Sequence, residues 1–380
     1  MLEFAGEEAQ GLGLDDGGLS GTSGNQGAFG RSGEAGDATM KVIAIIAGVA
    51  LVASVWLSVL RTVFIPRYGS SLAARITTKT VAATVSGTAG RLPYRARWRL
   101  LELGAPLTLF SLVWVWLIGS IAGFSLLAWG SSAARFGSHA LAAFFLLRQA
   151  SGASGSAAIP LGAVALLSTA LLLAAFSIHL IRVTDAYSRR ERPVISLAAQ
   201  AALPPDAEML IASYLRAGSP DHFGVMLSEW AQWLADIQGT HLGYPVLIRY
   251  RQAGDLSWIR AAVIVLDCAA LIEACAPEWS PPESAAVLAA GRRCLQGLAA
   301  QLDIRLPEIQ MSLHGRETYP FNETMAKVRA AGVPLRLGEA EAQVVFQRLR
   351  VQYAPYANAI AERLSCDLGG EGRVIYGGNR

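Results

Sequence analysis

The segment 150–156, Ala-Ser-Gly-Ala-Ser-Gly-Ser, contains only small residues and lies between two long apolar runs. In an ion-selective pore, rings of backbone carbonyls replace the water around an ion, and glycine permits the unusual backbone angles that such a ring needs. The same composition also suits a plain turn between two membrane helices. The candidate pore-loop residues are Ser151, Gly152, Ala153, Ser154, Gly155 and Ser156.

Few other residues form a pattern that could support catalysis or metal binding. The chain has no P-loop, G-x-S-x-G, H-E-x-x-H or G-x-G-x-x-G motif, so we do not predict an enzyme. The four cysteines lack C-x-x-C spacing, and neither a metal site nor a cofactor is expected. His241, in the string Thr-His-Leu-Gly-Tyr-Pro, is interpreted as a hydrogen-bonded histidine at a helix end. Sensing of pH or of a ligand by His241 is the alternative.

The elements that must position these residues are mostly apolar. Of 380 residues, 53% are hydrophobic and only 16% are charged, against about 25% charged residues in soluble domains. Three runs are long enough for a helix that crosses a bilayer, which takes roughly 20 residues. We therefore predict an all-α integral membrane protein with transmembrane helices at about 42–64, 105–129 and 157–182.

Basic residues predict the orientation of these helices. The first loop and the segment after the third span are both rich in arginine, whereas the N-terminal region is acidic. By the positive-inside rule, the N-terminus lies outside and the C-terminal part lies in the cytoplasm, at the inner (plasma) membrane. Residues predicted to contact anionic lipid are Arg91, Arg95, Arg97 and Arg99. So short a basic patch beside a membrane does not predict nucleic-acid binding.

The chain divides into three parts by composition. Residues 1–40 hold 11 glycines and seven acidic residues against Arg31 alone, which predicts disorder. Because Met40 directly precedes the first apolar run, the protein starts at either Met1 or Met40. Residues 41–185 form the predicted membrane domain, and residues 186–380 form a predicted helical cytosolic domain.

The cytosolic part shows helical patterns with recognisable ends. The apolar run 258–276 contains three charged residues, which favours a buried core helix over a fourth span. Ser280 and Glu283 have the spacing of a capping box. The remaining predicted features are a helix over 206–216, an apolar stripe of Met226, Trp230, Trp233 and Ile237, a helix over 322–331 ended by Gly332, and a helix over 339–364 bent at Pro355.

Several strings match a known group of proteins. They are Ala-Tyr-Ser-Arg-Arg-Glu at 186–191, Pro-Pro at 204–205 with Glu208 and Leu210, and the later Trp230, Trp233, His241, Tyr244-Pro245, Arg249 or Arg251, and Ser257-Trp258. With the order of spans and loops, residues 42–275 resemble bacterial potassium channel family proteins, of the two-transmembrane pore-loop superfamily. The resemblance implies a re-entrant pore helix at 139–149, a monovalent cation as the transported ion, and a homo-tetramer.

The filter itself departs from that family. Neither Thr-Val-Gly-Tyr-Gly nor a Thr-Leu-Gly-Phe variant is present. The filter glycines align either with Gly152 or Ala153 and Gly155, or with the segment 160–163. Neither alignment retains the threonine or the tyrosine. Small polar residues of the third span would then line a pore, or would instead pack against other helices and hydrogen-bond to the backbone of their own span: Ser168, Thr169 and Ser177.

Two functions are therefore expected from the sequence. The first is an ion-channel-like membrane protein that has lost the usual filter motif. The alternative is a non-conducting, membrane-anchored cytosolic sensor or scaffold.

Overall fold

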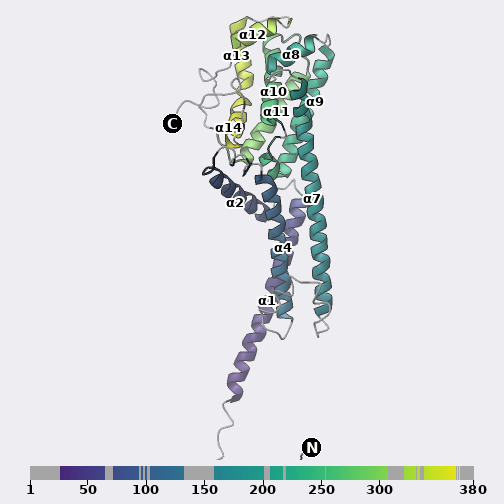
Figure 1. The fold of residues 1–380 in the computed structure, drawn as a ribbon, viewed down its shortest axis with the longest axis vertical. Coiled ribbons are helices and arrows are strands. Elements are labelled where there is room, and N and C mark those ends of the chain that lie inside the picture. Colours follow the sequence, from purple (N-terminus) through teal and green to yellow (C-terminus); the bar gives the residue numbers. More distant parts are fainter. Residues whose placement is uncertain are drawn as a thin grey trace, which may run out of the picture.

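A computed structural model gives the fold of this chain (Figure 1). Every regular element in the described part is a helix, so the predicted all-α class is confirmed there. The structure describes residues 26–64, 72–93, 96, 99–100, 103–131, 158–200, 206–216, 220–252, 254–306, 321–330, 332–333, 338–364, 366 and 368. The molecule is elongated, with a bundle of apolar helices at one end and a helical domain at the other.

Three helices are long and apolar enough to cross a membrane, as the sequence predicts. They are α1 (Gln26–Val63), α4 (Gly104–Gly130) and α7 (Ala158–Gln200), with apolar parts at Ala38–Val63, Gly104–Gly130 and Pro160–Ala199. We call α1, α4 and the first half of α7 the apolar bundle. Helix α7 continues well beyond the predicted end of the third span at residue 182.

Helix α1 begins earlier than the sequence indicates. Residues 26–40 fall in the segment predicted to be disordered, yet they continue the apolar helix backwards to Gln26. Extending an existing helix adds one hydrogen bond per residue and needs no new nucleus. A polar, glycine-containing segment can therefore be helical next to a strong apolar helix.

Close approach of backbones joins α1 to α4. A Cβ atom added at Gly123 would lie 2.6 Å from Val52 Cγ2, and one added at Gly119 would lie 2.8 Å from Val55 Cγ2. Small residues at such crossings are typical of helices packed in a bilayer. The indole of Trp116 donates a hydrogen bond to Ser58 Oγ at 3.0 Å, which satisfies both polar groups inside the bundle.

Helix α2 (Leu72–Ala89) lies where the bundle meets the second region (Figure 1). It packs against α4. Its threonine hydroxyls donate to backbone carbonyls one turn earlier, as Thr78 does to Ala74 at 2.8 Å. Lys79 of α2 reaches Asp303 of the second region, with Nζ 3.4 Å from Oδ2.

The second region, here the C-terminal domain, is built around one buried helix. Sixteen of the 18 residues of α10 (Trp258–Cys275) are buried, which confirms a core helix at this position. Around it lie the helices α8 (Ala207–Arg216), α9 (Pro220–Gly243), η2 (Pro245–Arg249), α11 (Glu283–Gln301), α12 (Phe321–Ala330), α13 (Glu339–Arg350) and α14 (Ala354–Leu364). The predicted stripe on α9 faces this core.

Charge inside the core is paired. Asp267 of α10 accepts a hydrogen bond from Arg350 Nε at 2.9 Å and another from the Tyr353 hydroxyl at 2.6 Å. Two acceptor contacts compensate the loss of water around this carboxylate. The three residues explain how α10 can be an interior helix and still carry an acidic group.

Helix ends agree with the predictions in several places. The Asp206 carboxylate accepts a hydrogen bond from the backbone N–H of Met209 at 2.8 Å, which caps α8. Gly332 follows α12 with a positive φ of 90°, a conformation that glycine adopts without strain. Residues 351–353 separate α13 from α14, so the bend predicted at Pro355 is a break just before it.

The predicted capping box is wrong. Helix α11 begins at Glu283 and its N-cap is Pro282, which makes no side-chain capping hydrogen bond. Ser280 instead donates to Glu273 Oε1 of α10 at 3.0 Å. The tertiary contact to α10 uses the hydroxyl that a local cap would need, so spacing alone misidentified its partner.

Candidate functional site

Helix α7 runs without a break from the apolar bundle into the C-terminal domain, where it lies beside α9 (Figure 1). Its buried side chains recur at helical spacing: Val183, Ala186, Arg190, Val194 and Leu197. A single arginine thus occupies a position on the buried face of the helix. Burying a guanidinium is costly unless its N–H groups find acceptors.

Arg190 donates hydrogen bonds to an acceptor on its own helix and to two backbone carbonyls at η2 and just after it. Its Nε donates to Glu191 Oε1 at 2.8 Å, and both side chains are almost fully buried. Its Nη1 and Nη2 donate to the carbonyls of Leu247 and Tyr250 at 2.9 and 3.0 Å. Arg190 therefore ties α7 to the short helix η2 and to the residue that follows η2.

His241 completes this cluster. It is fully buried, with its Nε2 3.4 Å from Arg190 Nη1 and its Nδ1 3.2 Å from Thr240 Oγ1. Because arginine only donates, Nε2 accepts and the ring proton lies on Nδ1. Burial, and then the charge of Arg190, lower the pKa of His241 to about 3. The ring is neutral at physiological pH, as a structural histidine requires.

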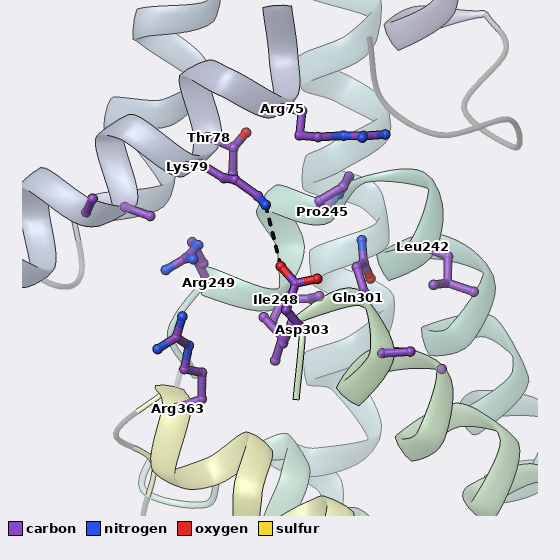
Figure 2. Close-up of a pocket in the computed structure, with 15 residues that line it drawn as sticks. Arg75, Thr78, Lys79, Leu242, Pro245, Ile248, Arg249, Gln301, Asp303 and Arg363 are labelled. Carbon is purple, nitrogen blue, oxygen red and sulfur yellow. Dashed lines mark hydrogen bonds and ion pairs between the residues drawn. The ribbon is translucent and has the colours of Figure 1, made fainter. Parts of the chain in front are cut away.

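A cavity of about 840 Å³ adjoins η2 (Figure 2). Its walls come from α2, the end of α9, η2, the end of α11 and α14. Four basic residues line it, against one acidic residue, Asp303: they are Arg75, Lys79, Arg249 and Arg363. Lys79 Nζ lies 3.4 Å from Asp303 Oδ2, and both side chains are mostly exposed.

The arginines of the cavity lack such a partner. In the part of the chain that the structure describes, no carboxylate forms a salt bridge with Arg75, Arg249 or Arg363. Arg249 is partly buried, and burial together with the like charge of Arg363 lowers its pKa. The cavity consequently has an excess of positive charge.

The buried cluster and the cavity share η2. This helix gives the Leu247 carbonyl to Arg190 and presents Arg249 to the cavity. In addition, Gln301 of the cavity wall donates from Nε2 to the backbone carbonyl of His241 at 3.0 Å. A change at the cavity therefore has a direct, hydrogen-bonded path to α7.

The predicted channel residues are only partly placed. The pore helix 139–149 and the pore-loop residues 151–156 lie outside the described residues, as do Arg95 and Arg97. Arg91 and Arg99 are exposed. Ser168 of the third span is buried, and its hydroxyl accepts a hydrogen bond from Trp56 Nε1 at 2.9 Å. The hydroxyls of Thr169 and Ser177 donate to the backbone carbonyls of Ala165 and Leu173, and Ser177 is exposed.

Sequence reasoning missed the residues that form this junction. Arg190 was interpreted as one of several basic residues after the third span, although it continues the 3–4 spacing of buried residues on α7. That spacing was the available signal. Arg249 enters the sequence analysis only as one of two arginines in the family resemblance, and Asp303 and Arg363 have no signal there, because the three residues meet only in the folded chain. The sensing role of His241 stays a prediction.

Comparison with known proteins adds no identification: no family model, curated protein or solved structure matches this chain. Among the described residues, no group of three or more His, Cys, Asp or Glu side chains is placed to hold a metal ion. Function is therefore argued from the junction itself.

Proposed function

We propose that this chain is a membrane-anchored sensor, in which a cytosolic C-terminal domain is coupled mechanically to membrane-spanning helices. The observation that carries this proposal is the continuity of α7, which contains both an apolar span and the buried Arg190 that holds η2. Helix α7 is continuous from the span to Arg190, and its interior Pro193 comes only after that contact. A continuous helix shared by two regions transmits a displacement of one to the other, whereas a flexible linker would not.

The orientation of the sensor follows from charge. Lys79 of α2 reaches Asp303 of the C-terminal domain, so the domain lies on the same side of the bundle as the basic first loop. Because basic loops stay in the cytoplasm, this arrangement supports a cytoplasmic domain. The exposed apolar side chains of α1, α4 and α7 would face lipid.

The coupling is testable with an Arg190→Met variant in lipid nanodiscs. We expect faster amide hydrogen exchange in residues 245–250, because two backbone carbonyls near η2 lose their donor. Spin labels at Ser177→Cys and Val344→Cys, two exposed positions in the two regions, should show a broader distance distribution. The matched control is Arg192→Met, which removes an exposed arginine from the same helix. Equal exchange and equal distances in both variants would refute mechanical coupling.

A channel-like oligomer is the second candidate, and one observation favours it. Helix α7 leaves Ser177 and several large apolar side chains exposed, among them Leu173 and Ile178, so a second copy of the chain could cover this face. The expected results are a tetramer in detergent, cross-linking through Ser177→Cys, and cation flux into liposomes. A stable monomer without flux would leave the sensor as the surviving proposal.

A further inference from the structure

We propose that the cavity bounded by α2, η2, α11 and α14 binds a phosphate-bearing anion. The proposal rests on the proposed sensor function and names the class of ligand that the sensor would detect. It concerns the cavity residues Arg75, Lys79, Arg249 and Arg363, which are distinct from the arginines of the first loop that were expected to contact lipid.

Charge is the first argument. Four cationic groups share one cavity with a single carboxylate, and that carboxylate is already close to Lys79. Three guanidinium groups remain without an anionic partner among the described residues. Like charges held together are unfavourable unless an anion lies between them. An anionic ligand would relieve this repulsion.

Geometry indicates which anion. Arg249 and Arg363 come from η2 and α14 and lie next to each other on one side of the cavity, and Lys79 points into it from α2, while the side chain of Arg75 extends away from this pair (Figure 2). Planar guanidinium groups make paired hydrogen bonds to carboxylate or phosphate oxygens. Two adjacent arginines from different elements, with Lys79 pointing into the same cavity, suit a tetrahedral group with three or four acceptor oxygens, which a phosphate provides and a single carboxylate does not.

Position leaves two sources for the phosphate. On α2, Leu72 and Ile76 lie one turn apart and are 71% and 55% exposed, so this helix can rest on the bilayer surface with its apolar side chains in lipid. A lipid headgroup could then reach the cavity from the membrane. The cavity is also large enough, at about 840 Å³, for a soluble phosphate compound.

The experiment measures binding to the full chain with two kinds of probe. Detergent-solubilised protein is titrated with inorganic pyrophosphate by calorimetry, and nanodiscs of phosphatidylcholine with or without phosphatidic acid are compared by hydrogen exchange at α2 and η2. We expect at least one probe to bind. Pyrophosphate binding would indicate a soluble ligand, whereas protection only with phosphatidic acid would indicate a lipid headgroup.

Variants decide whether the cavity is the site. Arg249→Gln with Arg363→Gln should weaken binding by about tenfold per guanidinium lost. The matched control is Arg293→Gln with Arg329→Gln, which removes the same charge from exposed positions that do not line the cavity. Asp303→Asn should strengthen binding, because a competing carboxylate is removed from Lys79. Equal loss in both double variants, or no binding of either probe, would overturn the proposal.

Failure of the site and failure of the sensor give different results. Suppose that a probe binds and the cavity variants abolish binding, but Arg190→Met leaves the distances between spin labels at Ser177→Cys and Val344→Cys unchanged. The phosphate site then stands and the sensor function is wrong. If no probe binds while Arg190→Met still loosens η2, the coupling stands and the phosphate site is wrong.

Discussion

The apolar bundle and the C-terminal domain both contain strongly apolar helices, but they bury them in opposite ways. In the most apolar window of α7, only 22% of the residues are buried within the chain, whereas α10 buries 16 of 18. The bundle brings backbones together at Gly48, Gly119 and Gly123. The domain instead packs large side chains and pairs the charges that it buries. Apolar content therefore predicts a helix, and the surroundings determine whether lipid or protein covers it.

The largest effect expected from this comparison comes from the buried charge of the domain. Arg350→Met would remove the cation beside Asp267, whose carboxylate would keep the hydrogen bond from the Tyr353 hydroxyl. Removing one member of a buried ion pair costs about 3–5 kcal/mol. We expect the variant to unfold at a much lower urea concentration. Tryptophan fluorescence of the protein in detergent measures this unfolding.

A compensating variant sharpens this result. Asp267→Leu combined with Arg350→Met removes both charges and should recover part of the lost stability, although Tyr353 then loses its acceptor. Arg348→Met, on the same helix, is the control for loss of an arginine that is not fully buried. If Arg350→Met and Arg348→Met unfold alike, paired charge is not what the domain depends on.

The bundle should respond instead to small changes in volume. Gly123→Ala places a Cβ 2.6 Å from Val52 Cγ2 and 3.3 Å from the Gly48 carbonyl, and overpacking of this kind costs about 1–3 kcal/mol. We expect lower resistance to unfolding by SDS. Gly162→Ala is the matched control, since a Cβ there meets nothing within 4 Å. Val52→Ala in the Gly123→Ala background should restore part of the loss.

Sequence alone predicted the parts of the fold that depend on runs of one residue type. The uncharged runs gave the three apolar helices, and the charges in 258–276 correctly indicated a core helix. The capping box failed because Ser280 bonds to Glu273 on another helix. A local pattern states which bonds are possible, whereas the folded chain determines which of them form.

The candidate site was less predictable for the same reason. Arg190 looks like an ordinary membrane-flanking arginine, and only the carbonyls of Leu247 and Tyr250 make it a buried anchor. The cavity combines residues from four segments that are distant in sequence. His241 was singled out correctly as a hydrogen-bonded residue near a helix end, while its contact with Arg190 was not foreseen.

A pH experiment tests whether the junction resembles the core of the domain, where Asp267 and Arg350 are buried as an ion pair. Folding holds the pKa of His241 at about 3, against 6.5 for an ordinary histidine. The unfolded chain therefore binds the proton more readily, so the stability from the neutral ring is present above pH 6.5 and is lost as the pH falls toward 3. One pH unit below 6.5, the expected loss is about 1.4 kcal/mol.

His241→Gln isolates this contribution, because glutamine keeps a hydrogen-bonding side chain but takes up no proton in this range. We expect its stability to fall less steeply than that of the unmodified chain between about pH 6.5 and 5, measured by urea unfolding at each pH. If the stabilities of His241→Gln and of the unmodified chain fall in parallel with pH, His241 is solvated. The junction would then differ from the core of the domain, where water is excluded and charges are paired.

The smallest effect concerns the hydrogen bond between two side chains of α1 and α7, from Trp56 Nε1 to Ser168 Oγ at 2.9 Å. Trp56→Phe removes the donor and keeps an aromatic ring. Hydrogen bonds between membrane helices contribute only about 0.6 kcal/mol on average, since the separated helices find other partners. Trp114→Phe is the control at an exposed position of α4. A loss for Trp56→Phe as large as that for Gly123→Ala would contradict the comparison, because a polar contact rather than close backbone packing would then hold the bundle together.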